Sequence, residues 1–254
     1  MNKLTYLTLF VFLPVLGYTQ IMPISFFKSK IESYIGTGSG NAIQFNSPNK
    51  HINGGTNPIL NITNSLTIEL WINPSQNLGI GQWDRFVHRN WPNGYFFGGR
   101  AGATNALAVV LSGDLNTAVS PNGTVIPNIW QHVAFVYDAV AKTIVIYRNG
   151  TSVSNTIWNG TITGGANNRL TLSAEGEAFN GIMDEVRIWN IARSASQILN
   201  NYNKSVATNS AGLVAYYKFN EGSGNTTVDA TGNGNNGSFV NSPIWIVPST
   251  APIN

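Results

Sequence analysis

The feature of this 254-residue chain that most constrains its fold is the repeated alternation of apolar and polar side chains over short stretches. Residues 66–74 (LTIELWINP) place Leu66 and the next three alternate residues on one face, and Pro74 ends the stretch. This alternation is typical of a β-strand, because successive side chains of a strand point to opposite faces. Gly, Asn and Pro separate such stretches, as expected for turns. The pattern therefore predicts a protein built mainly of short β-strands.

The middle of the chain extends this prediction to a meander. Residues 130–137 (WQHVAFVY) are apolar on both faces, as expected of a central strand in a two-layer sandwich, and residues 142–148 form the next predicted strand. The pair Asn149-Gly150 predicts a hairpin turn into residues 151–153, because both central residues of a type I′ turn need positive φ.

The last third of the chain predicts a strand, a helix and another strand. Alternation over residues 179–189 (FNGIMDEVRIW) predicts a strand with one face formed by Ile182, Asp184, Val186 and Ile188. Ser194 and Gln197 make a capping-box pattern, which predicts one short helix reaching about Tyr202. Residues 212–219 predict a final strand. Helices do not alternate with strands, so the sequence predicts an all-β sandwich rather than an α/β sheet.

The N-terminal residues 1–20 have the character of a secretory signal peptide, with Lys3 followed by an apolar run. This run is shorter than the roughly 20 residues of a transmembrane helix, and no later segment qualifies, so we expect a secreted or cell-surface protein without membrane insertion. Residues 21–40 are predicted to be a lead-in or linker, residues 41–247 the folded domain, and residues 248–254 a tail or linker.

Composition narrows the possible partners. Charged residues make up only 10% of the chain, with 14 basic and 11 acidic side chains. Residues 1–20 contain Lys3 as their single charge, which leaves 13 basic and 11 acidic residues, a net charge of +2. The basic residues form no dense run, so no nucleic acid partner is expected. The chain has no cysteine, so its stability outside the cytoplasm must come from its core, with or without a bound metal.

Four motifs span most of residues 41–247. They are residues 66–74, residues 130–138 running into 146–150 (IYRNG), residues 179–192 (FNGIMDEVRIWNIA) and residues 212–237 (GLVAYYKFNEGSGNTTVDATGNGNNG). In this order they resemble the laminin-G-like jelly rolls of the concanavalin-A-like lectin/glucanase superfamily. The resemblance implies a two-sheet antiparallel jelly-roll sandwich with one short helix. Family members bind sugars, proteins or lipids, and some relatives cleave polysaccharides, so fold alone does not decide function.

One motif stands in an unusual place. The motif of residues 212–237 often opens such domains, but here it comes last. Either its strand fills the same place in the fold from the other end of the chain, which we favour, or it begins a second repeat.

Asp184 is the residue for which the resemblance implies a metal. In related jelly rolls an aspartate of the matching strand helps to hold a structural calcium ion together with backbone oxygens, which are the ligands that calcium prefers. A carboxylate on an apolar face also needs a partner if it is buried. The alternative is an aspartate satisfied by backbone amides. At Phe45-Asn46-Ser47 the family usually has Phe-Asp-Gly, so a second possible carboxylate is missing.

The seven tryptophans suggest stacking on sugars, since an aromatic face packs against the apolar face of a pyranose ring. Trp71, Trp130 and Trp189 lie in strand motifs and are predicted to be core or sheet-covering residues. Others, including Trp83, Trp91 with Tyr95, and Trp158, lie in turn-rich stretches. We predict Trp91 and Trp158 as ligand-binding residues, because exposed aromatic side chains often mark a binding site.

Catalytic patterns are missing from the sequence. Retaining glucanases of this superfamily carry Glu-X-Asp-X-X-Glu on one strand, but Glu175 and Glu177 are followed by Asn at position 180. No Gly-X-Ser-X-Gly or His-Glu-X-X-His motif is present. His51, His88 and His132 fit no metal-ligand spacing and are predicted to be structural.

The sequence therefore predicts a secreted module that binds without catalysis. The first expected partner is an extracellular carbohydrate, with a possible structural calcium ion held through Asp184. A structural or adhesive module that contacts a surface protein is the alternative, and a divergent glycoside hydrolase is a third hypothesis. The hydrolase would require two carboxylates about 5 to 9 Å apart in a cleft.

Overall fold

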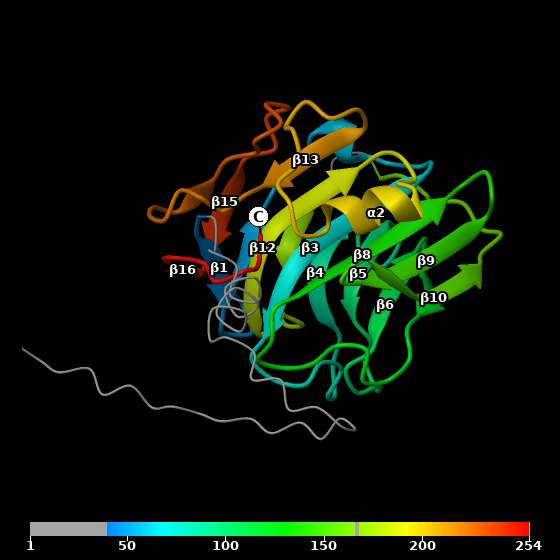
Figure 1. The fold of residues 1–254 in the computed structure, drawn as a ribbon, viewed down its shortest axis with the longest axis horizontal. Coiled ribbons are helices and arrows are strands. Elements are labelled where there is room, and N and C mark those ends of the chain that lie inside the picture. The colour runs from blue at the N-terminus through cyan, green and yellow to red at the C-terminus, as the bar shows by residue number, and fades with distance from the viewer. Residues whose placement is uncertain (1–39, 166–167, 254) are drawn as a thin grey trace, which may run out of the picture. The chain divides into compact units, whose positions relative to one another are not determined.

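The computed structural model describes residues 40–165 and 168–253, so the predicted signal peptide and nearly all of the predicted lead-in lie outside the described residues. The fold consists of two antiparallel sheets of eight strands each (Figure 1). This arrangement confirms the predicted all-β sandwich. Within the described ranges, no helix is long and apolar enough to cross a membrane.

The first sheet, here called sheet A, contains the strands that the sequence motifs predicted. Its strand order is β10-β9-β8-β3-β12-β1-β16, and β13 also pairs with β12. The bounds are β1 Ala42–Phe45, β3 Leu66–Pro74, β8 Gln131–Asp138, β9 Thr143–Arg148, β10 Thr151–Ile157, β12 Gly181–Trp189, β13 Leu213–Tyr217 and β16 Ile244–Ile246. The predicted type I′ hairpin is present, since Asn149 and Gly150 have φ values of 47° and 79°.

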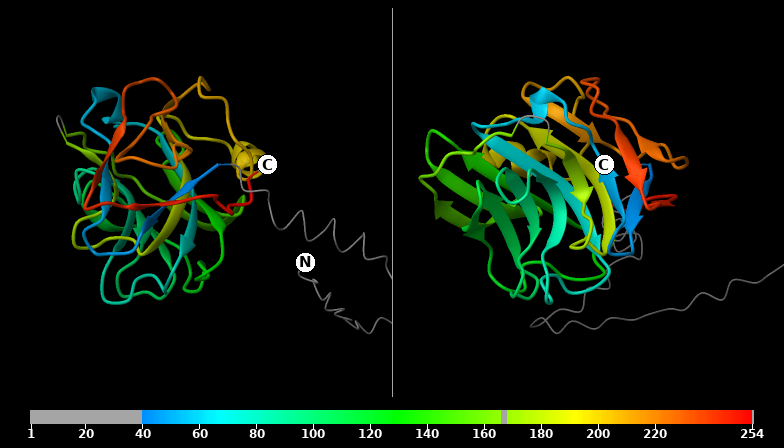
Figure 2. Two further views of the ribbon diagram at one scale, coloured as in Figure 1. Left: turned by 90° about the vertical axis from the view of Figure 1, so that its left-hand side faces the viewer. Right: turned by 180° about the vertical axis from the view of Figure 1, so that it is seen from behind.

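The second sheet, here called sheet B, has the order β14-β15-β2-β11-β4-β5-β6-β7. Its strands are β2 His51–Asn53, β4 Asp84–Arg89, β5 Tyr95–Gly99, β6 Leu107–Leu111, β7 Asp114–Val119, β11 Leu170–Ser173, β14 Thr226–Thr227 and β15 Gly237–Val240. The right-hand view of Figure 2 shows the molecule from behind relative to Figure 1. Most of these strands were not predicted, and Tyr95, which we assigned to a turn-rich stretch, begins β5 and is buried.

The main core lies between the two sheets. It contains aliphatic side chains of β3 such as Leu66 and Ile68, the rings of Phe86 and Phe97 from sheet B, and Phe135 from β8. Phe97 and Phe135 meet across the sandwich with ring centroids 5.3 Å apart. Burial of such apolar surface makes the largest favourable contribution to holding the two sheets together.

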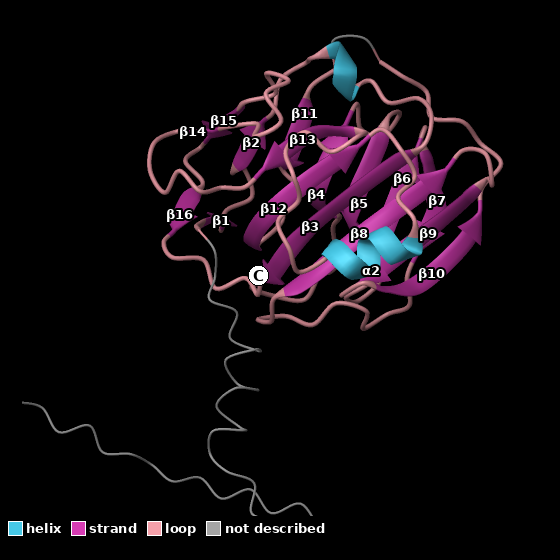
Figure 3. Cartoon of the chain, turned by 45° about the horizontal axis from the view of Figure 1, so that its top comes forward, coloured by secondary structure: helices cyan, strands magenta, loops and turns pink. Residues whose placement is uncertain are grey.

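A second apolar layer covers the outer face of sheet A. The helix α2 (Ala195–Asn201) begins with the predicted capping box between Ser194 and Gln197, and Tyr202 is its C-cap residue. Ile198 of α2 packs against Ala134, Val136 and Tyr147. Figure 3 shows α2 across β8 and β9. The short 3-10 helix η1 (Pro58–Leu60) lies elsewhere, near β13.

The end of the chain belongs to both sheets. β13 pairs with β12 in sheet A, while β15 pairs with β2 in sheet B. The strands of the 212–237 motif thus pair with both sheets of this fold. Residues 248–253, expected to be a tail or linker, place Ala251 and Ile253 against Trp71.

The alternation predicted for residues 179–189 is wrong at one point. Asp184 pairs with Trp71 of β3, and Arg187 pairs with Glu69. Two residues of β12 thus lie between these pairs, but only one residue of β3 does. Glu185 has a φ of 51°, so a β-bulge inserts one extra residue here. Met183, Val186 and Ile188 therefore face the core, whereas Asp184 points to the outer face of sheet A.

Candidate functional site

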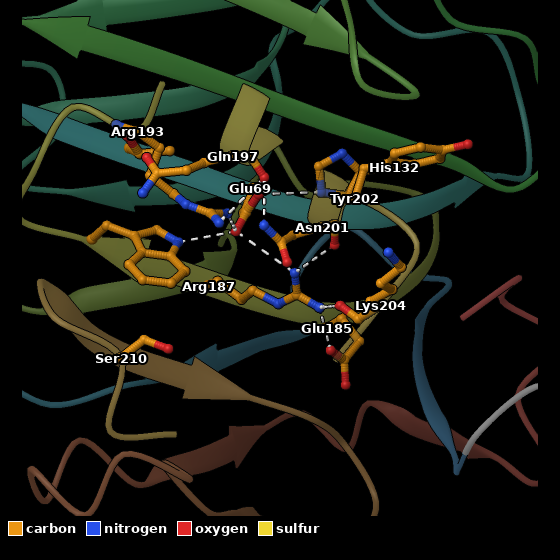
Figure 4. Close-up of polar contacts among 12 residues, drawn as sticks. Glu69, His132, Glu185, Arg187, Arg193, Gln197, Asn201, Tyr202, Lys204 and Ser210 are labelled. Atoms are coloured by element: carbon orange, nitrogen blue, oxygen red, sulfur yellow. Dashed lines mark hydrogen bonds and ion pairs between the residues drawn. The ribbon is translucent and has the colours of Figure 1, made fainter. Parts of the chain in front are cut away.

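A buried cluster of charged side chains lies on the outer face of sheet A, beneath α2 (Figure 4). Glu69 of β3 is at its centre and accepts hydrogen bonds from Arg193 Nη1 at 2.6 Å and Trp189 Nε1 at 3.0 Å. His132 Nε2 lies 3.6 Å from its other carboxylate oxygen. Burial alone would raise the pKa of Glu69, but His132, Arg187 and Arg193 lower it to about 2. Glu69 is therefore charged at neutral pH.

Arg187 connects this cluster to the chain that follows α2. Its Nη2 donates to Glu185 Oε2 at 2.6 Å and to the carbonyl oxygen of Lys204 at 2.6 Å. Two buried carboxylates, Glu69 and Glu185, are thus balanced by two arginines, Arg187 and Arg193. A pocket beside α2 is lined in part by Arg193, but the Nη1 of that residue is already bonded to Glu69. The cluster explains how the helix and its loop are held on the sheet.

Asp184 has protein partners for both of its carboxylate oxygens. Glu185 N donates to Oδ1 at 2.8 Å, and Ser249 Oγ donates to Oδ2 at 2.8 Å. The side chain is fully buried, and this burial raises its pKa well above the usual range. Within the described ranges no group of three or more His, Asp or Glu side chains is placed to hold a metal. One of these partners is a backbone amide, as the alternative expects, and the other is a serine hydroxyl. A calcium ion held through Asp184 stays a prediction.

Trp158 lies in a different environment from the one we predicted. It is only 9% exposed, belongs to the main core and contacts Tyr137 edge-on at 5.2 Å. Its Nε1 donates to Asp114 Oδ2 at 3.1 Å. Packing and this hydrogen bond account for the residue without a ligand.

Trp91 lies on the outer face of sheet B, and the structure places it in a different apolar cluster from Trp158. It is half-buried and packs on Trp83 and Phe96, with ring centroids 5.4 and 4.8 Å away. Phe96 comes from β5, which pairs with β4, and the loop between these strands carries Trp91. Strand pairing therefore positions this aromatic cluster.

Two arginines lie over the tryptophans of this cluster. The guanidinium of Arg85 lies 4.5 Å from the ring centroid of Trp91, and that of Arg100 lies 4.7 Å from that of Trp83. Such stacking is favourable between a cation and an indole face. We call Trp83, Arg85, Trp91 and Arg100 the Arg–Trp surface. The sequence motifs did not indicate it, because only Arg85 lies within a strand, while Trp83 precedes β4, Trp91 lies in the β4–β5 loop and Arg100 follows β5.

The charges around the Arg–Trp surface are partly paired. Arg85 Nε donates to Glu177 Oε2 at 2.9 Å, and its Nη2 bonds to the same oxygen. Arg100 Nη2 donates to Asn116 Oδ1 at 3.0 Å. The nearby His88 is neutral at physiological pH, because burial and the charge of Arg85 lower its pKa to about 3. Glu177 therefore offsets the charge of Arg85, whereas the guanidinium of Arg100 is bonded to the neutral amide of Asn116.

The other predicted residues are structural. Trp71 and Trp189 are buried on the outer face of sheet A, and the half-buried Trp130 packs in the cluster of Trp71. His132 belongs to the cluster around Glu69, and His51 contacts the carbonyl oxygen of Asn49 through Nδ1 at 3.2 Å.

Comparisons with solved structures agree with this fold. A candidate carbohydrate-binding protein from Bacteroides ovatus is similar to this chain with 22% identity and a TM-score of 0.62 over 81% of this chain; the match spans 61% of that protein. A heptameric pentraxin from Limulus polyphemus is similar with 14% identity and a TM-score of 0.51, over 84% of this chain and 98% of that chain.

Comparison with family models identifies the family. A search of curated proteins finds no match. A laminin-G family model, described as concanavalin A-like lectin/glucanases superfamily, matches residues 37–199. The match covers more than half of the chain and includes the Arg–Trp surface. This chain belongs to the concanavalin A-like lectin/glucanase superfamily.

Proposed function

We propose that this protein is a secreted, non-catalytic module that binds an extracellular carbohydrate through the Arg–Trp surface. The proposal rests on the half-buried Trp91, which packs against an aromatic cluster and lies beside Arg85. Binding sites for sugars combine apolar aromatic area with a few well-placed polar groups. The similarity to a candidate carbohydrate-binding protein supports the same class of ligand.

The position of α2 supports the choice of face. On sheet A the outer face is covered by α2 and by residues 249–253, and its charged side chains are buried. On sheet B the side chains of Arg85 and Glu177 keep 14% and 32% of their surface exposed. A ligand therefore reaches polar groups on sheet B without displacing a helix.

A non-catalytic role is supported by the state of the carboxylates. Glu69 and Glu185 are buried and bonded to arginines, and Glu177 is paired with Arg85. A glycoside hydrolase needs two carboxylates on either side of an accessible sugar bond. The buried pair beneath α2 does not meet that requirement.

The experiment is a glycan-array screen of the purified protein, repeated with Trp91→Ala. We expect binding to a defined set of glycans and a loss of about 10-fold or more for the variant, since stacking and the support of Arg85 are lost together. Trp245→Ala is the matched control, because Trp245 is a half-buried tryptophan of β16 in sheet A. Equal binding by both variants would show that the surface is wrongly assigned.

The same screen decides between this proposal and the adhesive alternative. The edge strand β10 is mostly exposed, and Ile157 at its end is 75% exposed, which is the feature expected of a protein-contact surface. Binding to no glycan would favour that alternative. Repeating the screen and a thermal melt with a chelator tests the calcium hypothesis, and an unchanged melting temperature would remove it.

A further inference from the structure

We infer that the carbohydrate bound by the Arg–Trp surface is anionic, carrying carboxylate or sulfate groups. This inference rests on the proposed function and adds the chemical class of the ligand. It comes from the way each tryptophan of the surface is covered by an arginine.

The first step is the geometry of the aromatic rings. Arg85 lies over Trp91, and Arg100 lies over Trp83. Trp91 also contacts Trp83 and Phe96 at centroid distances of 5.4 and 4.8 Å. Each indole therefore has a guanidinium group against one of its faces. A ligand that reaches the exposed part of Trp91 also meets the guanidinium of Arg85.

The second step is the hydrogen-bonding capacity of those edges. A guanidinium carries five N–H donors and no acceptor. Arg85 uses Nε and Nη2 for Glu177, and Arg100 uses Nη2 for Asn116. Among the residues that the structure describes, Nη1 of either arginine has no hydrogen-bond partner. The unused groups are donors with positive charge, which are complementary to carboxylate and sulfate oxygens.

The third step is the local charge. Glu177 offsets the charge of Arg85, whereas the hydrogen-bond partner of Arg100 is the neutral amide of Asn116. Stacking on the indoles fixes the direction of both guanidinium groups, so little side-chain entropy is lost when a ligand binds. Asn116 orients Arg100 in addition. Such a preformed pair of donors favours an anion over a hydroxyl group.

The test compares three oligosaccharide probes of equal length by titration calorimetry: an oligogalacturonate, a sulfated galactan and a neutral galactan. We expect the oligogalacturonate or the sulfated galactan to bind at least about 10-fold more tightly than the neutral probe, because charge-assisted hydrogen bonds are the stronger ones. Raising the salt concentration should weaken binding of the charged probe and leave the neutral one unchanged.

Variants assign the effect to the arginines. Arg100→Gln should weaken binding of the charged probe about 10-fold, and this loss should exceed any change in the affinity for the neutral probe; Arg100→Lys should recover part of the loss. Lys204→Gln is the control, because it removes one positive charge from an exposed side chain beyond α2.

Three outcomes overturn the inference: equal affinity for the neutral probe, binding of none of the three probes, or an Arg100→Gln variant that binds like the unchanged protein. In each case the proposed function would still be supported if the unchanged protein binds glycans on the array and Trp91→Ala weakens that binding. An array without hits would refute the proposed function itself.

Discussion

At the scale of single residues, buried charges determine how the outer face of sheet A is held together. Glu69 is fully buried with two arginines and the Trp189 indole around one oxygen. Removing one member of a buried ionic group is costly, because it leaves the others uncompensated in a medium of low dielectric constant.

We therefore expect Glu69→Gln to lower the free energy of unfolding by about 3–5 kcal/mol. Chemical denaturation followed by tryptophan fluorescence measures this change. Glu175→Gln is the control, since Glu175 is exposed, and it should change the free energy by less than about 0.5 kcal/mol. A similar small effect for Glu69→Gln would mean that the buried cluster does not stabilise the fold.

We expect the free energy of unfolding to depend on pH through the ionisation of Asp84. Burial, with the charge of Glu177, raises its pKa from 3.8 to about 6, although Gly79 N donates to Oδ2 at 2.5 Å. The folded protein then binds more protons than the unfolded chain between about pH 4 and 6, so this group lowers stability as pH rises through that window. The shift corresponds to roughly 2–3 kcal/mol at pH 7.

Asp84→Asn removes this ionisation and keeps an acceptor for Gly79 N. The variant should match the unchanged protein in melting temperature near pH 4 and exceed it at pH 7. A variant that melts at the lower temperature at pH 7 would contradict the assignment of the raised pKa.

The residue scale also shows a limit of sequence reasoning. Alternation predicted β12 correctly, but no sequence pattern around Glu185 indicates the bulge, after which the side chains point to the opposite faces. Because the bulge was not predicted, Asp184 was assigned to the same face as Val186 and Ile188, and the calcium hypothesis depended partly on that assignment. A one-residue bulge changes every side-chain direction after it, so such errors affect site residues most strongly.

At the scale of elements, local signals and long-range packing differ in how well they can be predicted. The capping box at Ser194 predicted α2 because its hydrogen bonds are local. Residues 248–253 were predicted to be a tail, because their packing on Trp71 depends on a strand about 180 residues earlier in the chain, and no local pattern indicates it.

The packing of this C-terminal segment can be measured directly. Ile253 is 1% exposed against Trp71, so Ile253→Ala should lower the free energy of unfolding by about 2–4 kcal/mol through lost burial and a cavity. Ile157→Ala removes the same atoms from a side chain that is 75% exposed and should have almost no effect. Equal effects of the two substitutions would show that the segment does not pack stably.

At the scale of the whole molecule, the predicted strands formed sheet A, while the candidate site lies on sheet B. Strands β4, β5 and β6 were not predicted. For β5 and β6 the reason is a lack of alternation, because Tyr95–Gly99 and Leu107–Leu111 are buried on both faces. Trp91 was predicted from its aromatic character, but its neighbours Arg85 and Arg100 could not be, because pairing of β4 with β5 brings them together.

The most direct test of the central claim, that ligands bind to the outer face of sheet B, is hydrogen–deuterium exchange with a glycan identified on the array. The Arg–Trp surface predicts slower exchange of backbone amides in residues 83–100 when the glycan is bound. Residues 195–211, which contain α2 and the loop beside it, should be unaffected. Protection confined to residues 195–211 would contradict the account and place the ligand on sheet A.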